Sequence, residues 1–87
     1  MKKTEGYRIR KLEDEYVVLP FGKRAEEVNE VISLSVTAGF MYLQAEEADS
    51  AEELAELVSK VYEVEKSVVY EDVVSVVRTL REKGLLL

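Results

Sequence analysis

The chain has 87 residues, of which 18 are acidic and 12 are basic, and it has neither cysteine nor histidine. A chain of this length folds as one small domain, which we expect to span residues 1–87. The missing residue types exclude a disulfide framework, a thiolate zinc site, and catalysis by cysteine or histidine.

The net charge of −6 is unevenly distributed. Residues 1–33 hold seven acids and seven bases, so all of the excess negative charge follows residue 33. Such a surface repels phosphate, and nucleic acid is a poor candidate partner. No apolar run approaches the ~20 residues of a membrane span, and we expect the protein in the cytoplasm.

The chain begins with a predicted β-hairpin. Tyr7 and Ile9 alternate with Arg8 and Arg10, which is the period-two pattern of a half-buried strand. After a charged turn, residues 16–19 predict a second, more apolar strand.

A break and a charged stretch separate the hairpin from a third predicted strand. Gly22 and the proline two residues before it interrupt the pattern, and we interpret the stretch 23–27 as a solvated loop. The run 28–34 then predicts a strand with Ile32 and Leu34 on its core face. Because it is the last strand before the helices, we expect it to have a free edge, which can accept another strand.

The remaining chain predicts three helices. The first starts near Ser35 or Thr37, either of which can cap it. The second has the clearest start, because Ser50 and Glu53 have the spacing of a capping box. The third begins near residue 67, and after it residues 85–87 are expected to fold back against the core.

The third predicted helix has more apolar surface than packing on one side requires. Its stripe consists of Val69, Val73, Val76, Val77 and Leu80, and it is extended sideways by Tyr70 and Val74. Projected on a helical wheel, this stripe covers roughly 160°, where ~100° is enough for a helix packed on one side. Gly84 is suited to the left-handed conformation that closes the helix. The surplus flank predicts a contact with a further element or a partner.

Several segments occur in an order typical of one family of small domains. They are Ile32-Ser33-Leu34-Ser35-Val36-Thr37-Ala38-Gly39, Phe40-Met41-Tyr42-Leu43, Ser50-Ala51-Glu52-Glu53-Leu54, Tyr62-Glu63-Val64, Asp72-Val73 and Leu80-Arg81-Glu82-Lys83-Gly84-Leu85-Leu86. Over nearly its whole length the chain thereby resembles the PqqD-like family, named for pyrroloquinoline quinone biosynthesis protein D. It departs from the family at Ser35 and Val36, where an asparagine and an acidic residue are usual, and at Tyr42, where tryptophan is usual.

The resemblance implies an α+β, winged-helix-like fold, with a three-stranded antiparallel sheet followed by a three-helix bundle. It also implies a stand-alone peptide chaperone that binds the leader segment of a ribosomally synthesised precursor peptide by strand addition. The leader lies between the third strand and the third helix, and a partner enzyme, often a radical S-adenosylmethionine (radical SAM) enzyme, modifies the peptide. The domain itself does no chemistry and needs no cofactor, and any iron–sulfur cluster belongs to the partner.

The residues alone point to the same groove, between the third strand and the surplus flank of the last helix. The predicted peptide contacts are Asn29, Glu30, Val31, Ile32, Ser33, Leu34, Tyr70, Val74, Val77, Arg78 and Arg81. Backbone pairing alone is too weak for tight binding, so apolar anchors on the helix must share it. Arg78 and Arg81 border the flank and would pair with acidic leader residues.

Other function classes use the same elements. A winged-helix regulator would place its recognition helix in the major groove of DNA, but Glu71 and Asp72 at the start of that helix oppose this docking. A small adaptor would bind a folded protein through the surplus flank, and a weak homodimer would bury that flank instead. Adjacent carboxylates such as Glu46 and Glu47 diverge by ~100° on a helix, so we expect no enzymatic activity.

Overall fold

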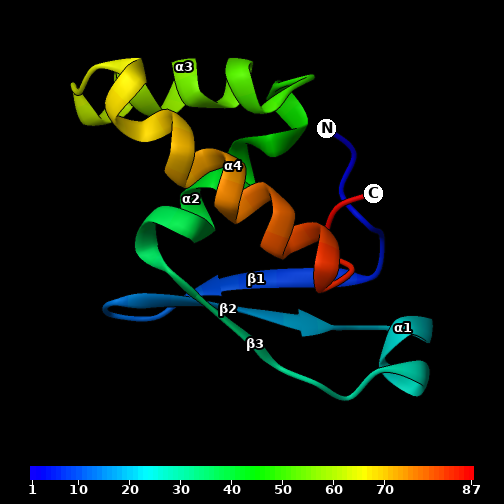
Figure 1. Cartoon of the computed structure of the whole chain (residues 1–87). Coiled ribbons are helices and arrows are strands. Elements are labelled where there is room, and N and C mark those ends of the chain that lie inside the picture. The colour runs from blue at the N-terminus through cyan, green and yellow to red at the C-terminus, as the bar shows by residue number, and fades with distance from the viewer.

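Three antiparallel strands form one sheet below the helices, in the order β1-β2-β3 (Figure 1). The computed structural model describes all 87 residues. The strands are β1 (Tyr7–Lys11), β2 (Glu15–Pro20) and β3 (Ile32–Ser35). The first two form the predicted hairpin, in which the Leu12 N–H donates to the Glu15 carbonyl at 2.8 Å. β3 pairs with β2 alone, so its other edge is free.

The alternation of side chains along the strands creates an inner and an outer face of the sheet. Ile9 lies opposite Val18, and Val18 lies opposite Ile32, which places the three together on the inner face. Val18 is fully buried and Ile32 is buried, as the period-two pattern predicted. Arg8 and Arg10 are exposed on the outer face.

The segment between β2 and β3 differs from its prediction in two ways. The stretch expected as a loop forms a short helix, α1 (Lys23–Glu27), because its residues are good helix formers and Gly22, at φ 58°, turns the chain into it. The third strand begins at Ile32 and not at Val28. β2 ends at Pro20, which has no N–H to donate, so nothing continues the ladder along the residues before β3.

The other helices follow β3. They are α2 (Val36–Gln44), the short 3-10 helix η1 (Ala45–Glu47), α3 (Ala51–Tyr62) and α4 (Lys66–Glu82). The Ser35 Oγ accepts the Ala38 N–H at 3.1 Å and caps α2. The Ser50 Oγ accepts the Glu53 N–H at 3.2 Å and caps α3. Both caps confirm the starts predicted for these helices.

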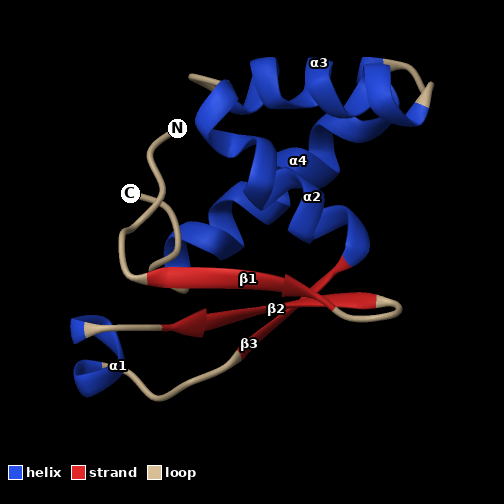
Figure 2. Cartoon of the chain, turned by 180° about the vertical axis from the view of Figure 1, so that it is seen from behind, coloured by secondary structure: helices blue, strands red, loops and turns tan.

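Helices α2 and α4 lie over one face of the sheet, and α3 packs on the side of these two helices that is away from the sheet (Figures 1 and 2). The core fills the space between these layers. Its largest fully buried side chains are Met41, Leu54, Leu80, Leu85, Val18, Val58 and Val73. The fold is therefore α+β, with the antiparallel sheet preceding the main helices, as predicted. No helix combines the length and the apolar character needed to span a membrane.

The chain ends by folding back against the core. Gly84, at φ 80°, turns the backbone after α4, and Leu85 and Leu86 are buried. Leu87 corrects the prediction for this segment, because its side chain is 67% exposed. Only its backbone is held, since its N–H donates to the Lys2 carbonyl at 3.0 Å.

Candidate functional site

The open edge of β3 is the first candidate feature. One side of this strand has no neighbouring strand, and its exposed side chains, Ser33 and Ser35, are small and uncharged. The other end of the sheet is β1, which exposes Arg8, Arg10 and Lys11. Charged side chains of this kind keep additional strands away from an edge. β3 is therefore the edge better suited to accept an added strand.

A groove lies between the end of β3, the start of α2 and the middle of α4. We call it the β3–α4 groove; it has a volume of about 230 Å³ and is lined by Ser35, Thr37, Ala38, Met41, Asp72, Ser75 and Val76. Met41 is fully buried and Val76 is half-buried, which makes the floor apolar. Asp72 is exposed and is not part of any ion pair. Ser35 is the only β3 residue in the lining, so a peptide paired with β3 has access to this floor near the end of the strand.

The predicted peptide contacts in residues 29–34 differ in whether their side chains are exposed or buried. Ile32 and Leu34 are 5% and 7% exposed, so their side chains belong to the core and only their backbone is available to a partner. Ser33 is exposed between them. Residues 29–31 are also exposed, but they precede β3 and lie outside the ladder.

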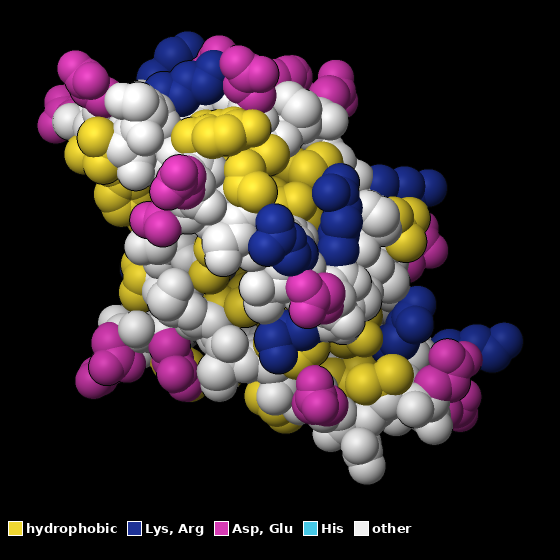
Figure 3. Space-filling view, in the orientation of Figure 1, with side chains coloured by type: hydrophobic (Ala, Val, Ile, Leu, Met, Phe, Trp, Pro, Cys, Tyr) yellow, Lys and Arg dark blue, Asp and Glu magenta, His cyan; other side chains and the backbone are white.

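The predicted contacts on α4 lie on the side of that helix that faces α3. A recess of about 360 Å³ is lined by Ala51, Val74, Val77, Arg78, Arg81 and Glu82, and we call it the α3–α4 recess. Tyr70 lies one turn before Val74, is 41% exposed and borders a second hollow with Glu52 and Lys66. Figure 3 shows hydrophobic side chains gathered where α3 and α4 adjoin, with Lys and Arg side chains next to them.

These positions correct the expectation that the surplus flank adjoins the third strand. Val74 and Val76 lie on the two sides of the apolar stripe, and it is Val76 that borders the β3–α4 groove. Val77 is only 4% exposed and belongs largely to the core. Asp72 and Ser75 line the groove but are absent from the predicted contacts. The i, i+4 spacing of Asp72 and Val76 places these two on one side of the helix and was a usable signal, but the wheel does not show which flank meets β3.

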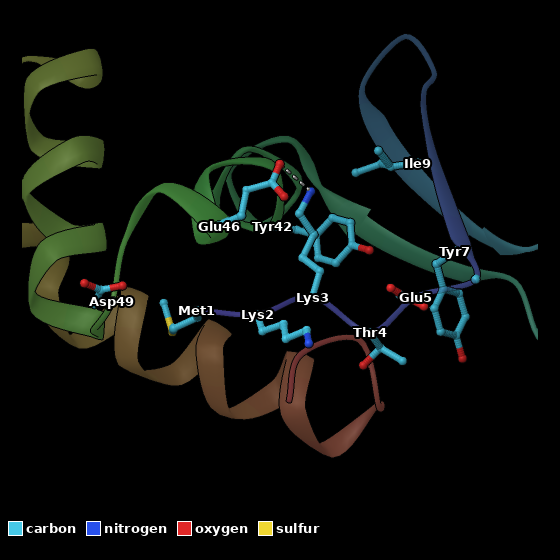
Figure 4. A pocket seen from close by; sticks show the side chains of 11 residues that line it. Met1, Lys2, Lys3, Thr4, Glu5, Tyr7, Ile9, Tyr42, Glu46 and Asp49 are labelled. Carbon is cyan, nitrogen blue, oxygen red and sulfur yellow. Dashed lines mark ion pairs between the residues drawn. The ribbon is translucent and has the colours of Figure 1, made fainter.

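The largest hollow, about 630 Å³, lies between the N-terminal residues, β1 and the α2–η1 segment (Figure 4). Lys3 Nζ lies 3.5 Å from Glu46 Oε1 and 4.8 Å from the ring centroid of Tyr42. Burial raises the pKa of Tyr42, with smaller contributions from the charges of Glu46 and Tyr7. Lys3 and Glu46 thus neutralise each other within the chain. The structure contains no group of three or more histidine, cysteine or carboxylate side chains placed to hold a metal ion.

Comparison of sequence and structure relates the chain to known proteins. The family model described as coenzyme PQQ synthesis protein D matches residues 15–86. The structure of TbiB1 in complex with the TbiA(beta) leader peptide is similar at a TM-score of 0.71 and 23% identity, covering 99% of this chain and 94% of that chain. A lasso peptide synthetase B1 complexed with the leader peptide has a TM-score of 0.72 and 21% identity, covering 99% and 95% respectively. No curated protein matches the sequence.

Proposed function

The chain belongs to the family of coenzyme PQQ synthesis protein D, and we propose that it binds the leader segment of a ribosomally synthesised precursor peptide. The leader adds as a strand to the free edge of β3, and one of its inward side chains enters the β3–α4 groove. The observation that carries the proposal is this free, uncharged edge beside a groove. Further support comes from the two similar structures, which are both complexes with leader peptides.

Backbone pairing supplies only part of the binding free energy. The four residues of β3 offer about four outward hydrogen bonds, each contributing a net ~1 kcal/mol. Micromolar affinity requires ~8 kcal/mol, so side chains must contribute at least the remaining ~4 kcal/mol. At ~25 cal/mol per Å², this corresponds to burial of ~160 Å² of apolar surface. Ala38, Met41 and Val76 provide the apolar surface of the groove for such burial.

The groove selects a leader by shape and by one charge. Its small volume favours a single inward apolar side chain, and hydroxyl groups of Ser35, Thr37 and Ser75 border it. Asp72 is the only charged residue in the lining and favours a basic leader residue nearby. Because an exposed ion pair contributes only ~0.2 to 1 kcal/mol, Asp72 affects specificity more than affinity.

The domain holds the precursor, and a partner enzyme modifies it. This enzyme belongs to the radical SAM class or to another peptide-modifying class. Any iron–sulfur cluster is bound by that enzyme, because this chain has no cysteine with which to ligate iron. In this proposal the domain acts as a peptide chaperone that presents the leader to the enzyme.

The charge on the helices opposes the alternative of a DNA-binding regulator. Glu71 and Asp72 are exposed on the N-terminal half of α4. α3 also exposes Glu52, Glu53 and Glu56. A helix pair with these carboxylates repels the phosphates of a duplex and releases no counterions on approach.

An amide chemical-shift titration tests the leader site directly. The isotope-labelled domain is titrated with the leader of a candidate short precursor encoded next to it. We expect saturable shifts in β3 and at Ala38, Ser75 and Val76. Ser75→Tyr fills the groove from an exposed position and should weaken leader binding at least about tenfold, or ~1.4 kcal/mol.

The matched control is Arg78→Tyr, which places the same ring on the side of α4 that faces α3. We expect it to leave leader affinity unchanged. If Arg78→Tyr weakens binding and Ser75→Tyr does not, the leader occupies the α3–α4 recess and the groove assignment is wrong. An absence of shifts at millimolar leader would refute leader binding.

A further inference from the structure

The α3–α4 recess combines an apolar wall with a positive rim. Val74 and Ala51 are half-buried in it, while Arg78 and Arg81 are exposed at its border. Neither arginine forms an ion pair, because all of the ion pairs of the structure use lysine. The lining also includes one carboxylate, Glu82, which follows Arg81 on α4. In a chain with a net charge of −6, these two exposed arginines form a local positive surface.

We propose that the α3–α4 recess is the docking site for an acidic segment of the peptide-modifying enzyme. The inference rests on the proposed function and names the surface through which that partner is recruited. A guanidinium group binds a carboxylate through two parallel hydrogen bonds, so Arg78 and Arg81 favour a segment with two acidic residues. Arg81 retains donors for this contact, since only its Nε is used, toward the Leu87 carbonyl at 3.1 Å.

The apolar part of the recess indicates which residue lies between the two acidic residues of the enzyme segment. Val74 and Ala51 form its wall, and Tyr70, 41% exposed, extends the apolar surface by one turn of α4. An apolar side chain between the two acidic residues fills this space. Burial of that side chain provides affinity, and the charges provide selection against basic segments.

The leader and the enzyme segment bind on opposite sides of α4, so they do not overlap but lie near each other. The β3–α4 groove is bordered by Asp72, Ser75 and Val76, whereas the recess is bordered by Val74 and Arg78. An α-helix with its side chains is ~10–12 Å across, which sets the separation between leader and enzyme. Leader and enzyme therefore bind at the same time, and the enzyme is held beside the precursor.

A second copy of this chain is the competing occupant. The corner between α3 and α4 exposes Glu63 and Glu65 next to Val64 and Val68, so it has the same chemistry as the proposed ligand. Insertion of this corner into the recess of another copy is a head-to-tail contact, which produces either a closed ring or an open chain of copies. Such an assembly would occupy the recess and would be detected as self-association that depends on protein concentration.

The test uses a short synthetic peptide in which glutamates flank a leucine and a phenylalanine, together with a version in which lysines replace the glutamates. We expect the acidic peptide to shift the amides of Ala51, Val74 and Arg78 saturably and to leave Ser33 unaffected. Arg78→Glu should weaken its affinity at least about fivefold, with Arg78→Lys intermediate. Lys60→Glu changes the net charge equally from an exposed position on α3 and should have no effect.

Three results would overturn the assignment. Equal binding of the lysine peptide would show that charge does not select the ligand. Competition between the acidic peptide and a bound leader would place both in one site. Concentration-dependent self-association that Arg78→Glu abolishes, measured by sedimentation, would assign the recess to a second copy. If the leader fails to bind while the acidic peptide binds the recess, only the leader assignment fails.

Discussion

A single glycine allows a close contact between a helix and the sheet. Gly39 lies in α2 directly against the ring of Tyr16 in β2. A Cβ added to Gly39 would lie 2.8 Å from Cε2 of that ring and closer still to Cδ2 and Cγ. Glycine is poor in helix interiors, so its presence here reflects the approach of α2 to the sheet and not helix propensity.

We expect Gly39→Ala to destabilise the domain. Overpacking costs ~1–3 kcal/mol, and the better helix propensity of alanine returns at most ~1 kcal/mol, so a net loss of up to ~2 kcal/mol is expected. Urea denaturation measures it. In the Tyr16→Ala background the ring is gone and Gly39→Ala should become neutral or stabilising. Additive effects of the two substitutions would contradict the contact.

Tyr42 lowers the stability of the folded domain at alkaline pH. Burial favours its neutral phenol and raises its folded pKa above the ordinary value of 10.0. The associated stability is fully present below pH 10.0 and is lost as the pH rises through the folded pKa. Tyr42→Phe should therefore lose less stability than the wild type between about pH 9 and pH 11. If the wild type and Tyr42→Phe lose equal unfolding free energy between these two pH values, the pKa of Tyr42 does not differ between the folded and unfolded states.

At the scale of elements, α3 has the best-defined start of the helices. Ser50 caps it, and the Glu53 side chain accepts the Asp49 N–H at 3.3 Å, so two free donors at this end are satisfied. The helix is also tied to α4, because Lys66 Nζ lies 3.0 Å from Glu52 and 3.1 Å from Glu56. Side-chain hydrogen bonds to these carboxylates raise the pKa of Lys66.

Loss of the cap should destabilise the domain measurably. Ser50→Ala removes the acceptor for the Glu53 N–H and is expected to cost ~1 kcal/mol in unfolding free energy. Ser67→Ala is the matched control, because Ser67 is exposed on α4 and its side chain makes no hydrogen bond in the structure. If both substitutions have the same effect, the cap does not contribute.

At the scale of the whole molecule, the two ends of the chain close the fold together. The Thr4 N–H donates to the Leu85 carbonyl at 3.0 Å, and Lys3 forms a bridge with Leu86. Leu85 is fully buried although it lies near the end of the sequence. The N-terminal segment is thus anchored by the last residues, beyond α4.

Leu85→Ala should be strongly destabilising. Truncation of a fully buried leucine leaves a cavity and typically costs ~2–5 kcal/mol. Leu87→Ala, at a side chain that is 67% exposed, should change the unfolding free energy by less than ~0.5 kcal/mol. Thermal and urea denaturation of both variants measure the difference. Comparable effects would mean that the burial of Leu85 is not a source of stability.

Local patterns were sufficient for most of the fold. The hairpin, the caps at Ser35 and Ser50 and the core side of Ile32 each depend on residues close in sequence. They were predictable because strand alternation, helix periodicity and capping are short-range properties of the backbone. The free edge of the third strand was also predicted correctly, since sequential antiparallel strands leave the last one at the end of the sheet.

Only the tertiary structure showed that the β3–α4 groove and the α3–α4 recess lie on different sides of α4. The sequence by itself determined that α4 has a wide apolar stripe, because the angles around a helix axis follow from residue spacing. It did not determine that Val76 lies toward β3 and Val74 toward α3. That arrangement, like the short length of β3, depends on where distant elements pack, and no local pattern encodes the contact between segments so far apart in sequence.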